Sequence, residues 1–283
     1  MNIKAPRGTK DITIQESYKW QYIEKNVRDL TALYGYREIR TPIFEHTELF
    51  DRGVGDTTDV VQKEMYTFLD KGGRSITLRP EGTAGVARSF IESGLVGGPQ
   101  PTKMFYLSAP VFRYENPQAG RLREHHQFGV EVFGAQDASV DAEIISLAWS
   151  LLHKLGVENL SLNINSIGCK HCRPEYNKAL RAYYTAHKAE LCGTCLDRLE
   201  RNPLRLLDCK NPACAALAAD APKITDYLCP ECEAHFGALQ SYLSKLNIPF
   251  AVNPKIVRGL DYYTKTVFEI ISSEIGAQGT VCG

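Results

Sequence analysis

Residues 104–134, MFYLSAPVFRYENPQAGRLREHHQFGVEVFG, form two strand-like runs on either side of a loop crowded with Arg, Glu, Asn and His. Side chains point to alternate faces along a strand. In the first run, the residues expected on one face are Phe105, Leu107, Ala109, Val111 and Arg113. In the second run, one face carries Gln127, Gly129, Glu131 and Phe133, and the other carries Phe128, Val130 and Val132. The two runs predict an antiparallel hairpin at the centre of the fold.

This hairpin would place the guanidinium of Arg113, the amide of Gln127 and the carboxylate of Glu131 on one face of the sheet. We call this face the floor. Polar groups on a partly buried sheet cost stability unless they have partners. One interpretation is a half-solvated sheet face with an internal ion pair. The other is a floor built for a ligand that carries both charges.

The composition is that of a soluble globular protein with room for two domains: 283 residues, 43% apolar and 23% charged. Lys+Arg and Asp+Glu are both 33, so net charge neither indicates nor excludes a nucleic-acid partner. The N-terminal stretch has no apolar leader, and no run is long enough to cross a membrane. We therefore expect a cytoplasmic protein with no membrane partner.

The chain before the hairpin alternates between helical and extended patterns. Residues 15–34 have apolar side chains at helical spacing and predict a helix that Gly35 ends. Strands are predicted over 36–45, where Pro42 indicates a sheet edge or an interface, and over 64–70.

Residues 76–92, ITLRPEGTAGVARSFIE, predict a strand followed by a helix. Thr83 is a suitable N-cap for a helix from Ala84, so Glu81 should lie at the turn beside unpaired helix amides. The Glu81 carboxylate then has two possible roles. It caps the helix, or it holds the ammonium group of a ligand.

The composition changes after the hairpin. A helix is predicted over 138–155 and a strand over 160–168, and the next 80 residues or so are helical and rich in cysteine. Strand character returns from Ile248. We therefore predict a core over 1–166, an inserted helical module over 167–247, and a continuation of the core over 248–283.

Eight of the nine cysteines lie in this module. They form three CxxC pairs and one CxxxxC pair: Cys169 and Cys172, Cys192 and Cys195, Cys229 and Cys232, and Cys209 with Cys214. Two such pairs complete a closed tetrahedral zinc site, so four pairs would fill two structural Zn²⁺ sites. The alternative is a set of small buried free thiols. Spacing alone leaves open which pair joins which.

The sequence has no GxxxxGK[ST] loop, no GxGxxG opening a βαβ unit and no HExxH. Any nucleotide would have to be bound by arginines on a sheet. Arg is suited to phosphate because its planar guanidinium is always charged and binds two oxygens at once. Candidates are Arg113, Arg121, Arg123 and Arg258.

Five stretches resemble the histidyl-tRNA synthetase family of class II aminoacyl-tRNA synthetases, in its bacterial form. They are APRGTKDI (5–12), GYREIRTPIFEHTELF (35–50), TLRPEGTA (77–84), FRYENPQAGRLREHHQFGVEVFG (112–134) and VRGLDYYTKTVFE (257–269). The last is the most specific to the histidine enzymes. NPLRLLDCK (202–210) also resembles the family's insertion.

The resemblance implies an α+β fold, with a class II antiparallel sheet flanked by helices and an inserted, mainly helical module. It implies a homodimer through the first class II motif near Pro42. It also implies two-step chemistry, in which L-histidine and ATP with Mg²⁺ form histidyl-adenylate and the histidine is then transferred to tRNA(His).

The residues that match the family's histidine-binding positions are Glu81, Thr83 and Gln127 for the ammonium, Glu131 and Tyr262 for the imidazole, and Tyr263 on the pocket wall. Arg113 and Arg258 match the two arginines on the ATP α-phosphate and are the expected catalytic residues. Further ATP contacts are expected from Glu115, Arg121 and His125.

Two departures from the family pattern stand out. His125 occupies the position of the phenylalanine that usually stacks on adenine. The sequence also stops at GTVCG, before the third class II motif and the anticodon-binding domain. The expectation is therefore a truncated catalytic domain with impaired ATP–pyrophosphate exchange.

Two other functions compete with this one. The non-catalytic, histidine-sensing regulatory paralogue of ATP phosphoribosyltransferase shares the sheet, but it lacks the insertion and generally the RGLDYY arginine. A zinc-dependent nucleic-acid module would explain the cysteines, but it would leave Glu81 and Glu131 without a role.

Overall fold

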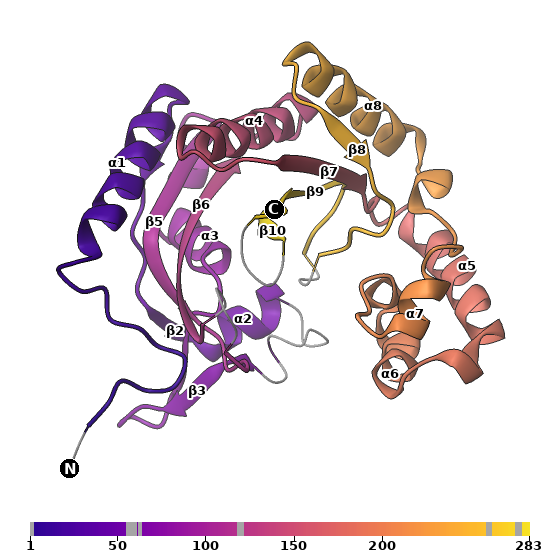
Figure 1. Cartoon of the computed structure of the whole chain (residues 1–283), viewed down its shortest axis with the longest axis horizontal. Coiled ribbons are helices and arrows are strands. Elements are labelled where there is room, and N and C mark those ends of the chain that lie inside the picture. Colours follow the sequence, from indigo (N-terminus) through magenta and orange to yellow (C-terminus); the bar gives the residue numbers. More distant parts are fainter. Residues whose placement is uncertain (1–2, 55–60, 62–63, 118–121, 259–261, 275–278) are drawn as a thin grey trace. The chain divides into compact units, whose positions relative to one another are not determined.

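The computed structural model describes residues 3–54, 61, 64–117, 122–258, 262–274 and 279–283. The chain forms two compact units (Figure 1). The first is built mainly from Met1–Gln136 and Leu147–Glu158, and the second from Asp137–Ser146, Asn159–Glu274 and Gly279–Gly283. Among the residues described, no helix combines the length and the apolar character that a membrane span requires.

The predicted hairpin is the centre of the first unit. Strand β5 (Thr102–Phe112) pairs antiparallel with β6 (Glu124–Phe133), and the short β1 (Arg37–Glu38) adds to β5 in parallel. The facing pairs include Met104 with Glu131, Tyr106 with Gly129, Ala109 with Gln127 and Val111 with His125.

The register of the hairpin shifts by one residue between Tyr106 and Ala109. A one-residue shift moves side chains to the opposite face of a sheet. Met104 and Tyr106 therefore share the floor with Ala109, and the prediction that Phe105 and Leu107 lie there is wrong. For Ala109 and the residues after it the predicted face is correct.

Helices cover both faces of this sheet (Figure 1). Helix α1 (Ser17–Leu33) and the second half of α4 (Ala138–Lys154) bury Phe105 and the face that carries Phe128, Val130 and Val132. Helix α3 (Thr83–Glu92) covers the floor, where the rings of Phe90 and Phe133 stack 4.2 Å apart. The helix predicted over 15–34 is confirmed as α1, and Gly35 follows it at φ +78°.

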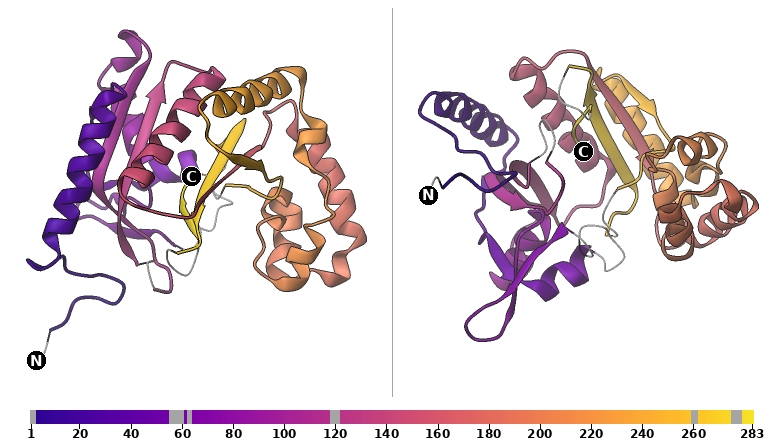
Figure 2. Two further views of the ribbon diagram at one scale, coloured as in Figure 1. Left: turned by 45° about the horizontal axis from the view of Figure 1, so that its top comes forward. Right: turned by 60° about the horizontal axis from the view of Figure 1, so that its bottom comes forward.

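The strand predicted over 36–45 is broken. Its ends form β1 and β2 (Phe44–His46), which belong to different sheets, and Pro42 lies between them. Strand β2 pairs with β4 (Ser75–Leu78), which in turn forms a hairpin with β3 (Tyr66–Leu69) (Figure 2). Helix α2 (Thr47–Val54) continues from β2, and a 3-10 helix, η2 (Leu95–Gly97), follows α3.

The second unit contains a four-stranded sheet in the order β10-β9-β7-β8. Strands β7 (Leu160–Ser166) and β9 (Thr266–Ser272) pair antiparallel through seven residues each. The edges are β8 (Phe250–Val252), parallel to β7, and β10 (Thr280–Cys282), antiparallel to β9.

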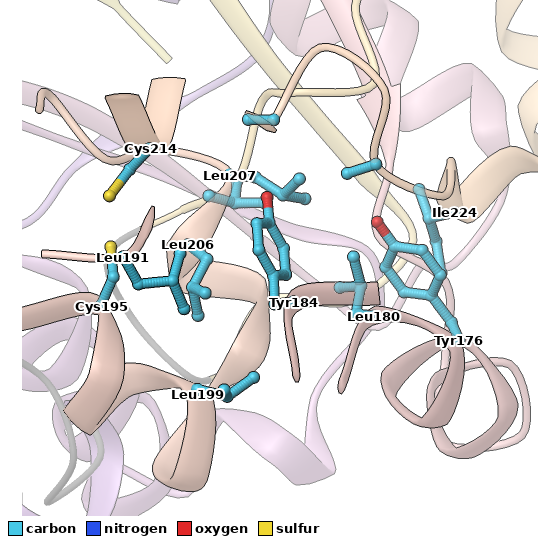
Figure 3. Close-up of a cluster of buried hydrophobic side chains, with 13 residues drawn as sticks. Tyr176, Leu180, Tyr184, Leu191, Cys195, Leu199, Leu206, Leu207, Cys214 and Ile224 are labelled. Atoms are coloured by element: carbon cyan, nitrogen blue, oxygen red, sulfur yellow. The ribbon is translucent and has the colours of Figure 1, made fainter. Parts of the chain in front are cut away.

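Every regular element described between β7 and β8 is helical. The α-helices are α5 (Arg173–Ala186), α6 (Gly193–Arg201), α7 (Pro212–Leu217) and α8 (Pro230–Lys245), and the 3-10 helices are η3 (Lys188–Glu190), η4 (Pro203–Leu206) and η5 (Ile224–Tyr227). Their core gathers Tyr176, Leu180, Tyr184, Leu206 and Ile224 with two cysteines (Figure 3).

Candidate functional site

The turn into α3 is built around the carboxylate of Glu81. This side chain is only 4% exposed, and its two oxygens accept the backbone N–H groups of Thr83 at 2.7 Å and Ala84 at 2.8 Å. Glu81 therefore caps the helix, which begins at Thr83 with Gly82 as its N-cap. The prediction of Thr83 as N-cap is wrong, because the carboxylate of Glu81 already accepts the first amides.

Thr83 instead links two carboxylates, because its backbone N–H donates to Glu81 and its hydroxyl donates to Glu131. The hydroxyl lies 2.7 Å from Glu131 Oε1, and Glu131 lies on the floor of the hairpin below α3. Burial, reinforced by the negative charge of Glu81, raises the pKa of Glu131 to about 7, although the Thr83 hydrogen bond opposes this shift. Burial also raises the pKa of Glu81, against the helix amides and the charge of Arg113.

Arg113 and Gln127 extend this floor. The Arg113 Nε donates to Pro80 O at 2.9 Å, next to Glu81. Gln127 lies opposite Ala109, and its side-chain Oε1 is buried with no hydrogen-bond partner among the described residues. A buried amide oxygen without a donor is costly, so it is available to a ligand N–H.

Tyr106 supports the floor, and the sequence analysis did not identify it. Its ring is 6% exposed and lies between two glycines: a Cβ would stand 2.4 Å from the ring at Gly82 and 2.2 Å from it at Gly129. Any larger residue at either position would displace the ring. A glycine inside the apolar strand run was the available signal.

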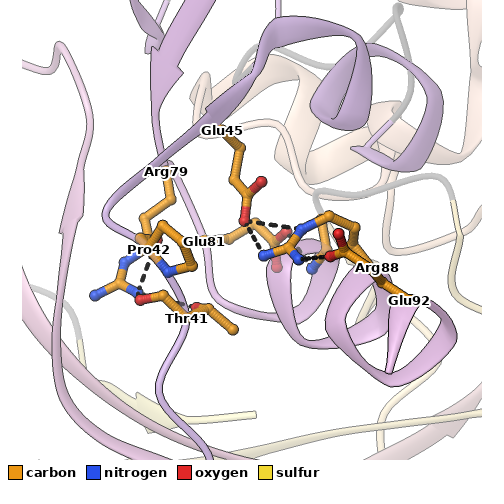
Figure 4. A network of polar contacts seen from close by, with 8 residues as sticks. Thr41, Pro42, Glu45, Arg79, Glu81, Arg88 and Glu92 are labelled. Atoms are coloured by element: carbon orange, nitrogen blue, oxygen red, sulfur yellow. Dashed lines mark hydrogen bonds and ion pairs between the residues drawn. The ribbon is translucent and has the colours of Figure 1, made fainter. Parts of the chain in front are cut away.

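Arg79 is a second residue that the sequence analysis passed over. It is 6% exposed and donates to Pro110 O at 2.8 Å and Thr41 O at 3.0 Å, which ties β4 to β5 and to the segment before β2 (Figure 4). Arg88 on α3 forms ion pairs with Glu45 and Glu92 in the same region. These contacts hold the turn that carries Glu81.

The second unit brings together Arg258, Tyr262 and Tyr263. The Tyr262 and Tyr263 rings stack with centroids 4.9 Å apart, and the Arg258 guanidinium lies 5.4 Å from the Tyr263 ring. Arg258 is paired with Glu269 at 3.6 Å and donates to Gly283 O at 3.1 Å. Its Nε is buried without an acceptor among the described residues, which leaves a donor for a ligand oxygen.

The other predicted ATP contacts lie near the loop of the hairpin. His125 is on β6, two residues from Gln127 and on the same face. Glu115 accepts from Arg123 Nε through its main-chain oxygen at 2.9 Å. Arg121 lies outside the described residues, so its predicted role stays a prediction.

The eight cysteines of the helical module form two groups of four. The root cluster consists of Cys169, Cys172, Cys229 and Cys232, and the inner cluster of Cys192, Cys195, Cys209 and Cys214. Within each cluster all four sulfurs lie within 4.8 Å of one another. The fold therefore determines which two cysteine pairs come together in each cluster, which the sequence spacing left open.

The sulfur geometry fits a tetrahedral metal site. Measured Sγ–Sγ distances are 3.7 Å for Cys169–Cys172, 3.9 Å for Cys169–Cys229 and 3.9 Å for Cys192–Cys209. Four sulfurs about 2.3 Å from one zinc ion would be separated by about 3.8 Å. Backbone N–H groups also point at the sulfurs, for example Cys229 N at 3.2 Å from Cys172 Sγ.

The electrostatics of the clusters favour thiolates at their more exposed members. Hydrogen bonds from the backbone of His171 and Cys172 lower the pKa of Cys169 to about 6. A hydrogen bond from the Cys195 backbone lowers the pKa of Cys192 to about 7. Burial raises the pKa of Cys195, Cys214 and Cys232, so the thiolates that a metal requires form most readily at the more exposed members, and a bound metal has to offset burial at the others. The ninth cysteine, Cys282, has its pKa raised to about 11 by burial.

A model of the family described as histidyl-tRNA synthetase matches residues 8–280. The chain belongs to the histidyl-tRNA synthetase family. The histidine–tRNA ligase of Caldanaerobacter subterraneus subsp. tengcongensis is 62% identical over 283 residues, and that of Clostridium novyi is 63% identical over 283 residues. All of this chain is aligned in both cases, against 68% and 67% of those proteins.

Solved structures agree with the family assignment. The chain resembles apo Staphylococcus aureus histidyl-tRNA synthetase with a TM-score of 0.75 and 44% identity, over 95% of this chain and 62% of that one. The predicted class II architecture is confirmed. The relatives at about 60% identity are histidine–tRNA ligases, which confirms the predicted enzyme class. The family in general uses histidine, tRNA and ATP with Mg²⁺.

The regulatory paralogue is not favoured. A Bacillus halodurans protein described as an ATP phosphoribosyltransferase regulatory subunit/histidyl-tRNA synthetase has a TM-score of 0.69, but only 22% identity. That likeness shows the fold alone. The relatives at about 60% identity are named histidine–tRNA ligases.

The raised pKa of Glu131 predicts a pH-dependent stability. Its carboxyl titrates near 4.5 when unfolded and near 7 when folded, so the folded chain binds more protons between these values and loses stability as pH rises through them. The free energy of unfolding of the wild type, minus that of Glu131→Gln, should fall by roughly 2.5 kcal/mol from pH 5 to pH 8. Urea unfolding of both proteins measures this difference, and a difference independent of pH would contradict the assignment.

Proposed function

We propose that this chain carries the histidine-binding and histidine-activating site of a histidine–tRNA ligase. The observation that carries the proposal is the pair of carboxylates, Glu81 and Glu131, joined through Thr83 on a sheet floor. Two adjacent carboxylates in a partly buried site repel each other. A ligand with an ammonium and a ring N–H relieves that repulsion.

Each end of histidine then has a partner. Glu81, Thr83 and Gln127 Oε1, which has no donor among the residues described, accept from the ammonium group, and Glu131 accepts from an imidazole N–H. In the second unit, the stacked rings of Tyr262 and Tyr263 occupy the positions that match the family's aromatic contacts with histidine. An amino acid without a ring N–H would leave the Glu131 carboxylate unpaired, which is a strong basis for discrimination.

Two arginines assist the activation step. A carboxylate oxygen of histidine attacks the α-phosphorus of ATP, the bond from that phosphorus to the bridging oxygen breaks, and pyrophosphate leaves. Arg113 and Arg258 neutralise the charge that builds on the α-phosphate in the transition state. Glu115, Arg121 and His125 contact the rest of the nucleotide, and Mg²⁺ accompanies ATP. The terminal ribose hydroxyl of tRNA(His) then attacks the activated carbonyl and AMP leaves.

The assembly is part of the proposal. We infer a homodimer through the first class II motif, supported by the exposed apolar side chains of Ile43 and Phe44 next to Pro42. We also infer a cytoplasmic location, where tRNA charging has its substrates. Sedimentation as a monomer at micromolar concentration would contradict the dimer, and recovery with the membrane fraction would contradict the location.

Each cysteine cluster holds one zinc ion in this proposal. Four thiols at tetrahedral spacing, with backbone N–H groups directed at the sulfurs, support it. Four thiolates leave no open coordination position, so the zinc is structural and takes no part in the reaction.

Titration of the chain with L-histidine tests the proposed site. Isothermal titration calorimetry should show saturable binding of histidine and no comparable binding of phenylalanine or glutamine. Glu131→Ala should weaken histidine binding about a hundredfold, because it removes a buried charged acceptor.

Glu124→Ala is the matched control. Glu124 lies on the same strand as Glu131, but it points to the opposite face of the hairpin, so its removal should leave histidine affinity unchanged. A wild-type chain that binds no histidine, or a Glu131→Ala variant that binds it normally, would overturn the proposal.

A further inference from the structure

The segment that carries Tyr263 is attached to the root of the helical module. Beyond the last pair of the β7–β9 ladder, Ile167 N donates to Lys265 O at 2.8 Å and Lys265 N donates to Gly168 O at 2.9 Å. Gly168 immediately precedes Cys169 of the root cluster. The main chain after Tyr263 is therefore held by the residues that lead into the cluster.

Arg173 makes a second connection from the first CxxC turn. It is the first residue of α5, directly after Cys172, and its backbone N–H donates to Cys169 O at 3.0 Å. Its side chain reaches back: Nε donates to Ile167 O at 3.2 Å and Nη2 donates to Tyr263 O. One guanidinium thus joins the cysteine turn to the carbonyl of Tyr263.

Glu231 makes a third connection from the other CxxC turn. It lies between Cys229 and Cys232, and its Oε1 accepts from Lys265 Nζ at 2.7 Å. Lys265 has a left-handed backbone, with φ +56°, which reverses the chain just before β9. Because Glu231 is largely exposed, this ion pair is weaker than the Arg173 contact.

We propose that the root cluster and Arg173 position the Tyr262–Tyr263 pair, so that the root of the inserted module sets the affinity for histidine. Both CxxC turns reach the 263–265 segment, one through Arg173 and the other through Glu231. One metal ion bound by both turns fixes these two anchors relative to each other. Tyr263 packs on Ile167, Ile256 and Val267, and its ring lies against Tyr262 and Arg258. This inference rests on the proposed function.

The inner cluster has a different role. Cys195 and Cys214 lie in the apolar core of the module with Tyr184 and Leu206. Val257, the residue directly before Arg258, also belongs to this core. The polar contacts of Arg173 with Tyr263 O and of Glu231 with Lys265 Nζ come from the root instead. The inner cluster therefore maintains the fold of the module, and the root cluster positions the Tyr262–Tyr263 pair.

Arg173→Ala tests the inference against Arg181→Ala as a matched control. Arg181 is on the same helix and also donates to main-chain carbonyls, those of Leu199 at 2.8 Å and Glu200 at 2.9 Å, but these lie within the module. Arg173→Ala should raise the KM and Kd for histidine about tenfold and leave kcat nearly unchanged, since it weakens binding in ground and transition states alike. Arg181→Ala should leave both constants unchanged.

Two further measurements separate positioning from general loss of structure. Amide hydrogen exchange over residues 262–266 should quicken in Arg173→Ala and not in Arg181→Ala, and Arg173→Lys should restore part of the histidine affinity by keeping one donor. Cys169→Ser should reproduce the histidine defect with one zinc ion fewer per chain.

An Arg173→Ala variant with normal histidine affinity and normal amide hydrogen exchange would overturn this inference. A wild-type chain that binds no histidine would overturn the proposed function itself.

Discussion

Replacing Arg258 with alanine should lower the rate of histidine-dependent ATP–pyrophosphate exchange about a thousandfold, equivalent to about 4 kcal/mol of transition-state stabilisation. The guanidinium is held by Glu269, Gly283 O and the Tyr263 ring, so its orientation is set before substrate binds. Its Nε is buried and finds no acceptor in the part of the chain that the structure describes. Such a prepositioned donor is most effective where charge develops, and the α-phosphate is where charge develops in this reaction.

The exchange rate is to be measured at saturating histidine and ATP on the full-length gene product. Arg258→Lys should recover only a small part of the activity, because an ammonium cannot replace the forked guanidinium. Arg201→Ala is the control. In the second unit, Arg201 and Arg258 both line a cavity of about 220 Å³, but the Arg201 side chain is half exposed and pairs with Asp197. Near-normal exchange by Arg258→Ala, or an equal loss in Arg201→Ala, would remove Arg258 from the catalytic step.

Removal of the zinc ion that we propose for the inner cluster should unfold the helical module. The module's core includes Cys195 and Cys214, and Cys192 and Cys209 pack against it, so separation of the four thiolates disrupts the packing that holds α6 and α7. Structural zinc contributes directly to folding free energy. Cys214→Ser should therefore lower the melting temperature of the module by about 10 °C or more.

Calorimetry and limited proteolysis of residues 168–247 measure this effect, and elemental analysis should find two zinc ions per chain in the wild type and one in the variant. Cys282→Ser is the matched control, since Cys282 is a partly buried cysteine outside both clusters. It should keep both zinc ions and shift the melting temperature by only a few degrees. Wild-type protein purified without zinc, and stable without it, would refute the proposal for both clusters.

Much of the site was predictable because it depends on residue identity and local period. The 3.6-residue spacing of apolar side chains predicted α1, and strict alternation predicted which residues of β6 share a face. Glu81 was expected at a strand-to-helix turn from Pro80 and the helix that follows. The motif residues are sufficient to predict the correct family.

The details of that turn were less predictable. The capping of α3 by Glu81 and the bond from Thr83 to Glu131 depend on competition between acceptors for the same amides. N-cap propensities rank each residue type separately, so they cannot predict which of several nearby acceptors binds the first helix amides. Tyr106 was missed for a related reason, since its importance comes from two glycines that are distant in sequence.

The sequence by itself determined the family, the hairpin, the helical module and the residue types available for histidine and phosphate. Tertiary structure alone decided the register shift at Tyr106–Ala109, the grouping of the cysteines and the link from Arg173 to Tyr263. The physical reason is the distance along the chain between the residues that determine each feature. Periodicity and capping are set by neighbours within one turn or one strand, whereas register, metal ligand sets and long-range hydrogen bonds depend on which distant segments the packed core brings together.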